Sequence, residues 1–319
     1  MNDNNRRSFL KKLGAGAGLY AMPASLFANT QYTPEHVKGN RTNSYLMIDR
    51  RNEGAHPFNG QYTGSYLDHI AFPIGGIGAG MFCMEGTGAI SHLSVNNRPE
   101  MYNEPYAFAA ISVKGVANSA KVLEAPVPGW KLFGPAGSGN GSGNRSYGLP
   151  RFESGSFLPR FPFATLELDD SDIPLQIKVV GWSPFIPGDE DNSSLPGGVM
   201  EYQFKNNSDK KVEAVFSYNA RNFIDENGRI LEEKNGFRLT KANSKKESGF
   251  SIFVDQDDAV VDYCWFRGGW FDPQTILWKQ IQSGELVSNP PVDGSAPGAS
   301  IFVPVSLQPG EEKVVSVHF

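Results

Sequence analysis

Cysteine is scarce in this sequence of 319 residues, which contains only Cys83 and Cys264. Two cysteines cannot form the set of several disulfides that stabilises small secreted domains, and they do not make the paired-cysteine motif of a zinc site. A single disulfide between them and two buried thiols are both compatible with the sequence.

An excess of positive charge is also absent. Lys and Arg number 29 against 34 Asp and Glu, which gives a net charge of −5 and an isoelectric point of about 5.6. Nucleic-acid-binding domains usually carry a basic patch or stripe. Nucleic acid is therefore not an expected partner.

Recognisable catalytic and metal-binding motifs are missing as well. The five histidines include no pair spaced by four residues, and the acidic runs Asp189–Asp191 and Asp255–Asp258 lack the glycine and terminal glutamate of a calcium loop. No GxSxG motif occurs, and neither cysteine has the setting of a catalytic nucleophile. We therefore expect no metal ion, no cofactor and no catalytic residue in this chain.

The glycine-rich stretch from Phe72 to Gly88, FPIGGIGAGMFCMEGTG, fails the templates of both common nucleotide-binding loops. Met81 stands where a dinucleotide fingerprint that starts at Gly76 needs its last glycine, and the lysine of a P-loop is absent. Interleaved apolar side chains such as Ile77 argue against a solvent-exposed linker. The stretch is therefore predicted to be a tight, buried turn in a packed region.

Glycine and proline are abundant, with 35 and 22 residues, and they favour many turns and short strands. Apolar and polar residues alternate from Met200 to Lys205 and again from Val212 to Tyr218, on either side of the turn-prone segment Asn206–Asp209. We interpret the two runs as a β-hairpin with one buried face. Further short strands are expected at residues 107–113, 163–168, 175–179, 237–240, 250–254, 260–265, 301–305 and 314–319.

One helix is expected after Asp272, which can cap its first turn. Pro273 suits the start of this helix, Leu277 and Trp278 lie on its apolar face, and Gly284 ends it. Many short strands with little helix are typical of an all-β fold. The sequence predicts a large antiparallel β-sandwich with one or two short helices.

The N-terminus has the pattern of an export signal. The twin arginines Arg6 and Arg7 precede a moderately apolar run from Leu13 to Phe27, which is too short and too glycine-rich for a stable membrane span. We expect a twin-arginine signal peptide over residues 1–28, an extended lead-in over 29–65 and a β-sandwich domain over 66–319. The expected location is the bacterial periplasm or the medium.

Aromatic residues cluster from Cys264 to Phe271, and Trp182 marks a second position of this kind. Trp182, Trp265, Arg267 and Trp270 are the candidate residues for a domain interface or a sugar contact, because exposed Trp and Arg side chains suit both roles. The alternative is that the tryptophans fill the core of the sandwich beside the helix.

Three segments resemble the motifs of a known family. Ile74–Gly80 (IGGIGAG) is similar to the glycine-rich motif of glycoside hydrolase family 116, the family that includes non-lysosomal glucosylceramidase. Gly181–Pro187 (GWSPFIP) and Asn192–Pro196 (NSSLP) are similar to its SPFIP and SSLP signature. The resemblance extends over roughly residues 66–319. Residues 81–88 depart from the Arg/Gly/Phe/Arg/Trp run of eukaryotic members, which indicates a divergent bacterial branch and argues against glucosylceramide as the substrate.

The resemblance concerns only the N-terminal β-sandwich of that family. The family's Glu nucleophile and Asp acid/base lie in a C-terminal (α/α)-barrel outside these 319 residues, so no residue here inherits either role. The resemblance implies a module that is inactive alone, packs against the barrel of the same polypeptide and helps to shape its glycoside pocket. The strand pattern at residues 313–319, which reaches the last residue, also suggests a longer protein.

Two other functions stay open at this stage. The chain could be a free-standing, secreted carbohydrate-binding or cell-surface β-sandwich, or the sandwich could itself be catalytic.

Overall fold

Strands are the main regular structure in the described part of the chain, and helices are few and short. The computed structural model describes residues 56–101, 103–132, 145–242, 249–269 and 272–319. The predicted signal peptide and most of the predicted lead-in therefore lie outside the described residues, as does Trp270.

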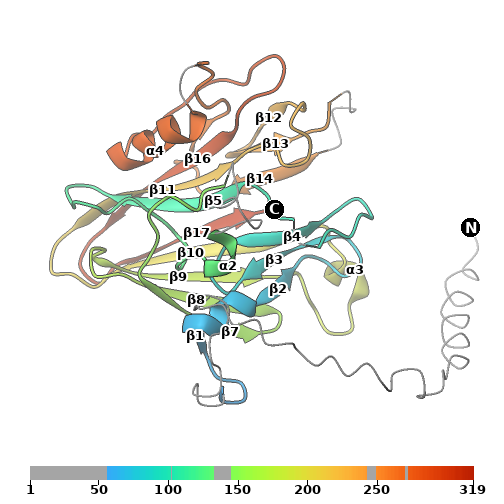
Figure 1. Cartoon of the computed structure of the whole chain (residues 1–319), viewed down its shortest axis with the longest axis horizontal. Helices are drawn as coiled ribbons and strands as arrows, with labels where there is room; N and C mark the ends of the chain where they lie inside the picture. Colours follow the sequence, from blue (N-terminus) through green and yellow to red (C-terminus); the bar gives the residue numbers. More distant parts are fainter. Residues whose placement is uncertain (1–55, 102, 133–144, 243–248, 270–271) are drawn as a thin grey trace, which may run out of the picture. The chain divides into compact units, whose positions relative to one another are not determined.

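The largest sheet has nine antiparallel strands in the order β1-β7-β8-β9-β10-β17-β14-β13-β12 (Figure 1). Its strands are β1 (Tyr62–Thr63), β7 (Ser154–Arg160), β8 (Phe163–Asp169), β9 (Leu175–Trp182), β10 (Val199–Asn206), β17 (Glu312–His318), β14 (Phe250–Val254), β13 (Gly236–Leu239) and β12 (Ile230–Glu233). The inward side chains of β9 and β10 alternate with partly exposed ones, which is the pattern of a sheet with one buried face.

Two smaller antiparallel sheets complete the core. A five-stranded sheet has the order β15-β16-β11-β5-β6, and a three-stranded sheet has the order β2-β3-β4. Their strands are β15 (Val260–Asp262), β16 (Ala299–Leu307), β11 (Val212–Ala220), β5 (Ala107–Val113), β6 (Lys121–Val122), β2 (Ala71–Ile74), β3 (Met81–Glu85) and β4 (Ile90–Ser94). The all-β sandwich that the sequence predicts is confirmed.

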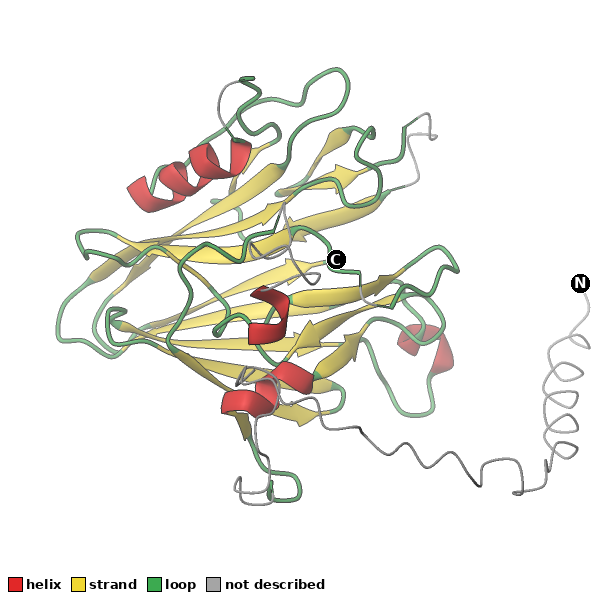
Figure 2. Ribbon diagram, viewed as in Figure 1, coloured by secondary structure: helices red, strands yellow, loops and turns green. Residues whose placement is uncertain are grey.

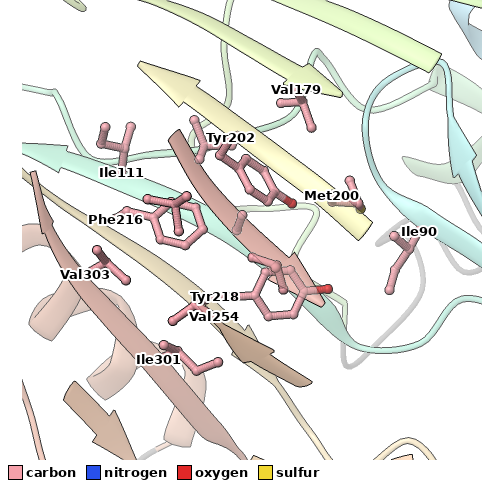
Figure 3. Close-up of a cluster of buried hydrophobic side chains, with 14 of the residues drawn as sticks. Ile90, Ile111, Val179, Met200, Tyr202, Phe216, Tyr218, Val254, Ile301 and Val303 are labelled. Carbon is pink, nitrogen blue, oxygen red and sulfur yellow. The ribbon is translucent and has the colours of Figure 1, made fainter. Parts of the chain in front are cut away.

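The nine-stranded and five-stranded sheets face each other across one apolar core (Figure 3). Tyr202 and Phe204 of the larger sheet contact Phe216 of the smaller one, with ring centroids 5.0 and 5.9 Å apart. The three-stranded sheet packs against the nine-stranded one. Ile74 of β2 lies so close to Gly181 of β9 that a Cβ placed on Gly181 would be 2.4 Å from Ile74 Cδ1. Aromatic and aliphatic side chains from all three sheets therefore form one hydrophobic cluster.

The predicted helix is confirmed as α4 (Pro273–Ser283), which covers the outer face of the five-stranded sheet (Figure 2). The Asp272 side chain accepts a hydrogen bond from the Gln274 N–H at 3.2 Å, and Gly284 ends the helix with φ of 65°. Leu277, Trp278 and Ile281 of the helix are buried. Helix and sheet together bury a second apolar cluster.

The other described helices are short. They are the 3-10 helix η3 (Gly64–His69), α2 (Gly129–Leu132) and α3 (Glu190–Ser193). None of the helices in the described residues is long and apolar enough to cross a membrane.

The predicted hairpin at Asn206–Asp209 is wrong. β10 pairs with β9 and β17 in the nine-stranded sheet, whereas β11 pairs with β5 and β16 in the five-stranded sheet. The connection is thus an arch between sheets, and Asn206 holds it by donating hydrogen bonds to the carbonyls of Lys210 and Leu307. The sequence pattern of two alternating runs around a polar turn is the same for an arch and for a hairpin, because both structures bury one face of each strand.

Both cysteines are free and buried, so they do not form a disulfide. Burial raises the pKa of the Cys83 thiol to about 11 and also raises the pKa of the Cys264 thiol. Both side chains therefore stay protonated at neutral pH and pack as small apolar groups.

A buried lysine links α2 to β3 and to the loop before β5. The Lys131 side chain is 3% exposed, and its Nζ lies 2.6 Å from a carboxylate oxygen of Glu85 and 2.6 Å from one of Glu104. Tyr147 donates its hydroxyl proton to Glu104. Burial raises the pKa of Glu85 above its ordinary value, although the Lys131 charge opposes this shift. One cation therefore pairs with two neighbouring carboxylates inside the protein.

Candidate interface at the glycine-rich loop

The glycine-rich loop Gly75–Gly80 joins β2 to β3 and is held by backbone contacts. The N–H of Gly75 donates to the Ser183 Oγ at 3.0 Å, and the N–H of Ile77 donates to the Ser193 carbonyl at 2.8 Å. These bonds attach the loop to the two segments that carry the other family-like motifs.

The loop needs glycine because neighbouring backbone approaches it closely. A Cβ on Gly76 would lie 2.0 Å from the Leu195 carbonyl oxygen, and one on Gly75 would lie 2.3 Å from the carbonyl oxygen of Gly80. Gly78 and Gly80 also have φ of 73° and 106°, which favour glycine. The predicted tight turn is confirmed for Gly76, which is buried, but the exposed side chain of Ile77 contradicts the expectation of a buried loop.

The second and third motif segments are bonded to each other. The Ser193 Oγ accepts a hydrogen bond from the Ile186 N–H at 2.9 Å and donates to the Ile186 carbonyl at 3.1 Å. A little further along the chain, Gly198 exchanges two backbone hydrogen bonds of 3.0 and 3.2 Å with Phe319. The glycine-rich loop therefore meets two motif segments that are distant from it in the sequence.

Apolar side chains project into solvent at this place. Ile77, Phe161, Ile186 and Leu195 are each more than half exposed, and Phe161 contacts Phe185 edge to face with ring centroids 4.9 Å apart. We call these five residues the glycine-loop face. A cluster of exposed apolar side chains of this kind is typical of a protein–protein contact.

Two hollows flank the loop. The first, of about 460 Å³, has apolar walls that include Met81, Phe250 and Phe319, with Lys241 at its lining. The second, of about 720 Å³, is lined by Phe161 and Phe185 and also by the run Asn96–Pro99. The lining of neither hollow includes an Asp or Glu residue.

The four residues predicted for an interface or a sugar contact do not gather here. Trp265 is 1% exposed, donates its indole N–H to the Ser300 Oγ at 2.8 Å and packs in the cluster under α4. Trp182 lies on the outer face of the nine-stranded sheet, where its indole N–H donates to Glu201 at 2.9 Å. Arg267 is exposed beyond Trp265, and Trp270 lies outside the described residues. Trp182 and Trp265 are thus on opposite outer sides of the sandwich.

The segment around Trp265 is anchored by a buried carboxylate. Asp262 Oδ1 accepts hydrogen bonds of 3.0 Å from the Cys264 N–H and the Asn289 side chain, while its Oδ2 has no partner among the described residues. Burial raises the pKa of Asp262 to about 6. These contacts fix the turn that places Trp265 in the core.

Sequence reasoning missed Phe161 and the run Asn96–Arg98. Phe161 follows β7 and the Asn-Asn pair follows β4, and no periodic or motif signal marks either position. The dipeptide Asn96-Asn97 does signal a turn, because Asn tolerates positive φ, and the two residues have φ of 58° and 56°. That signal predicts backbone shape but not the neighbouring aromatic wall.

Candidate metal ligands are not grouped in the described residues, where no cluster of three or more His, Cys, Asp or Glu side chains could hold an ion.

The comparison with protein families identifies a match over most of the described residues. A family model described as "beta-glucosidase 2, glycosyl-hydrolase family 116 N-term" matches residues 71–319. No curated protein matches the chain. The matched region includes all three segments that meet at the glycine-rich loop.

Proposed function

Because the chain belongs to glycoside hydrolase family 116 through its N-terminal domain, we propose that it is the non-catalytic β-sandwich module of a retaining β-glycosidase. A retaining enzyme uses two carboxylates about 5–5.5 Å apart, one as nucleophile and one as acid/base. In this proposal both belong to an (α/α)-barrel on the same polypeptide, outside the 319 residues. The module packs against the barrel and shapes the rim of its pocket.

The glycine-loop face supports this role. Ile77, Ile186 and Leu195 come from the three family-like segments, and all three are exposed although they are apolar. An exposed apolar cluster is unfavourable in water, and covering it with a second domain removes that cost. Family motifs that serve only the fold would place their apolar side chains inside.

Assembly of the two domains tests the proposal. We expect the purified chain to leave aryl β-glucosides intact, and a separately produced barrel domain to bind the chain and become active or more stable. The variants Ile77→Asp and Leu195→Asp should weaken this binding by at least about tenfold, because each would bury an unpaired charge at the contact. Leu286→Asp is the matched control, since Leu286 is also an exposed leucine but lies outside the glycine-loop face.

Three outcomes would count against the proposal. Turnover of the glucoside by the chain alone would place the catalytic groups within the sandwich. If the Leu195→Asp and Leu286→Asp variants bound the barrel domain equally well, the glycine-loop face would not be the contact surface. A stop codon directly after codon 319 would favour the alternative of a free-standing carbohydrate-binding protein.

We further propose that the module is exported to the periplasm through the twin-arginine route, on the basis of Arg6, Arg7 and the apolar run that follows them. Expression in a bacterium should give a periplasmic product whose mass corresponds to cleavage after Ala28. The double variant Arg6→Lys, Arg7→Lys should keep the uncleaved chain in the cytoplasm. A periplasmic product from that variant would argue against this route.

A further inference from the structure

The lining of the second hollow combines aromatic rings with hydrogen-bonding side chains. Phe161 and Phe185 meet edge to face at an interplanar angle of 67°, and the exposed ring of Phe161 borders the hollow. Exposed aromatic rings of this kind offer a flat apolar surface to a ligand.

Asn96, Asn97 and Arg98 line the same hollow, and all three are exposed. In the described part of the chain, the two Asn side chains make no hydrogen bond, and Arg98 makes only a solvent-exposed contact of 3.7 Å with Glu100. Amide groups can both donate and accept, whereas guanidinium donates. The Asn96–Arg98 run therefore presents unused hydrogen-bond donors and acceptors to a ligand in the hollow.

The glycine-rich loop also lines this hollow. No heavy atom lies within 4 Å of the place where a Cβ on Gly78 would be, so this part of the loop is open. The lining contains a single cation, Arg98, and no carboxylate. The absence of acidic groups from this lining argues against a cationic ligand, and one exposed guanidinium is a weak site for a phosphate group.

These features fit a sugar. The C–H face of a pyranose ring is apolar and packs on an aromatic ring, while its hydroxyls donate to and accept from amide groups. We propose that the second hollow is a binding site for a short neutral glycan, held between Phe161 and the Asn96–Arg98 run. Its size lies within the range of small-molecule sites.

The inference rests on the proposed function for its biological role but not for the binding itself. Ile77, Phe161 and Phe185 also belong to the glycine-loop face, so in the assembled glycosidase the hollow would lie at the domain contact and hold sugar units there, beyond the cleaved bond. In the chain alone, the hollow would be open to solvent and would bind a glycan weakly.

Titration of the 319-residue chain with cellotetraose tests the site. We expect a dissociation constant on the order of 1 mM, measured by NMR or calorimetry. Phe161→Leu keeps an apolar side chain but removes the aromatic face, and it should weaken binding by about tenfold. Asn97→Gly suits the positive φ of this position and removes the amide, and it should weaken binding by about fivefold.

Phe253→Ala is the matched control, because Phe253 is a partly exposed aromatic residue of the first hollow. Its affinity should equal that of the parent chain. Absence of cellotetraose binding, or binding that only the Phe253 variant weakens, would overturn the inference. Displacement of the sugar by inorganic phosphate would do so too, because it would assign the hollow to an anion.

The two proposals can fail separately. Loss of glycan binding in Asn97→Gly together with normal assembly with the barrel domain supports both. Normal assembly with no glycan binding by the parent chain removes only the glycan site, whereas glycan binding without assembly removes only the docking role.

Discussion

Replacement of Lys131 by methionine should lower the free energy of unfolding by about 3–5 kcal/mol at pH 7 to 8. Methionine fills a similar volume, so the change removes the charge more than the packing. Glu85 and Glu104, each 2.6 Å from the Lys131 Nζ in the parent protein, would then face each other without a cation. Urea unfolding of the purified variant measures the loss.

The loss should depend on pH in a known direction. Burial already raises the pKa of Glu85, and removing Lys131 removes the main influence that lowers it. The folded variant therefore holds a proton on Glu85 over a range in which the unfolded chain has released it. Stability falls as pH rises through that range, so the variant should be less impaired at pH 5 than at pH 8.

Lys211→Met is the control for this experiment. Lys211 also lies 2.6 Å from a glutamate, Glu213, but both side chains are about half exposed. Exposed pairs of this kind contribute about 0–1 kcal/mol. Equal losses in the two variants, or a loss at Lys131 that does not change with pH, would contradict the role assigned to the buried cation.

Replacement of Gly76 by alanine should destabilise the protein by about 3 kcal/mol or more. The new methyl group would lie 2.0 Å from the Leu195 carbonyl oxygen, which is backbone and cannot move aside as a flexible side chain can. Relief of the clash requires the loop and the Leu195 segment to separate, which also strains the hydrogen bond from Ile77 to Ser193. Thermal or urea unfolding detects the effect.

The Gly78→Ala variant separates two causes of instability, a clash with neighbouring backbone and an unfavourable backbone conformation. Gly78 has φ of 73° but no heavy atom within 4 Å of its Cβ position, so alanine there should cost only about 1 kcal/mol. If the Gly78 variant were as unstable as the Gly76 variant, the contact with Leu195 would not be the cause. If the Gly76 variant also bound the barrel domain more weakly, the displaced loop would have disturbed the glycine-loop face as well.

Local signals in the sequence predicted local structure well. The cap at Asp272, the apolar face of the helix and the stop at Gly284 belong to neighbouring residues, and α4 has these bounds. The run Phe250–Val254 was likewise expected as a strand and forms β14. Such features depend on propensity and spacing, which the sequence shows directly.

Partners distant in the sequence could not be predicted in the same way. Strands β10 and β11 were expected to pair because they are adjacent, but each finds partners elsewhere and their side chains meet across the core. The alternation that predicts a strand does not say which sheet receives it. Trp265 shows the same limit, because an aromatic cluster can be an exposed site or a core, and here Trp265 lies in the core.

The candidate site was predictable as three motifs but not as a surface. Ile77, Ile186 and Leu195 stand in segments that the family resemblance singled out, yet only the fold shows that all three point into solvent. The second hollow was missed entirely, because Phe161 and Asn97 come from separate parts of the chain and neither belongs to a motif. Tertiary contacts, which bring such residues together, leave no local trace.

The position of β17 has a consequence for how the protein is made. This strand lies inside the nine-stranded sheet, between β10 and β14, although every other strand of that sheet precedes it in the chain. A ribosome therefore releases β10 and β14 long before the strand that joins them. Until His318 has left the ribosome, both keep an open edge of unpaired N–H and C=O groups. The nascent chain, rather than the finished protein, is the form most exposed to edge-to-edge association.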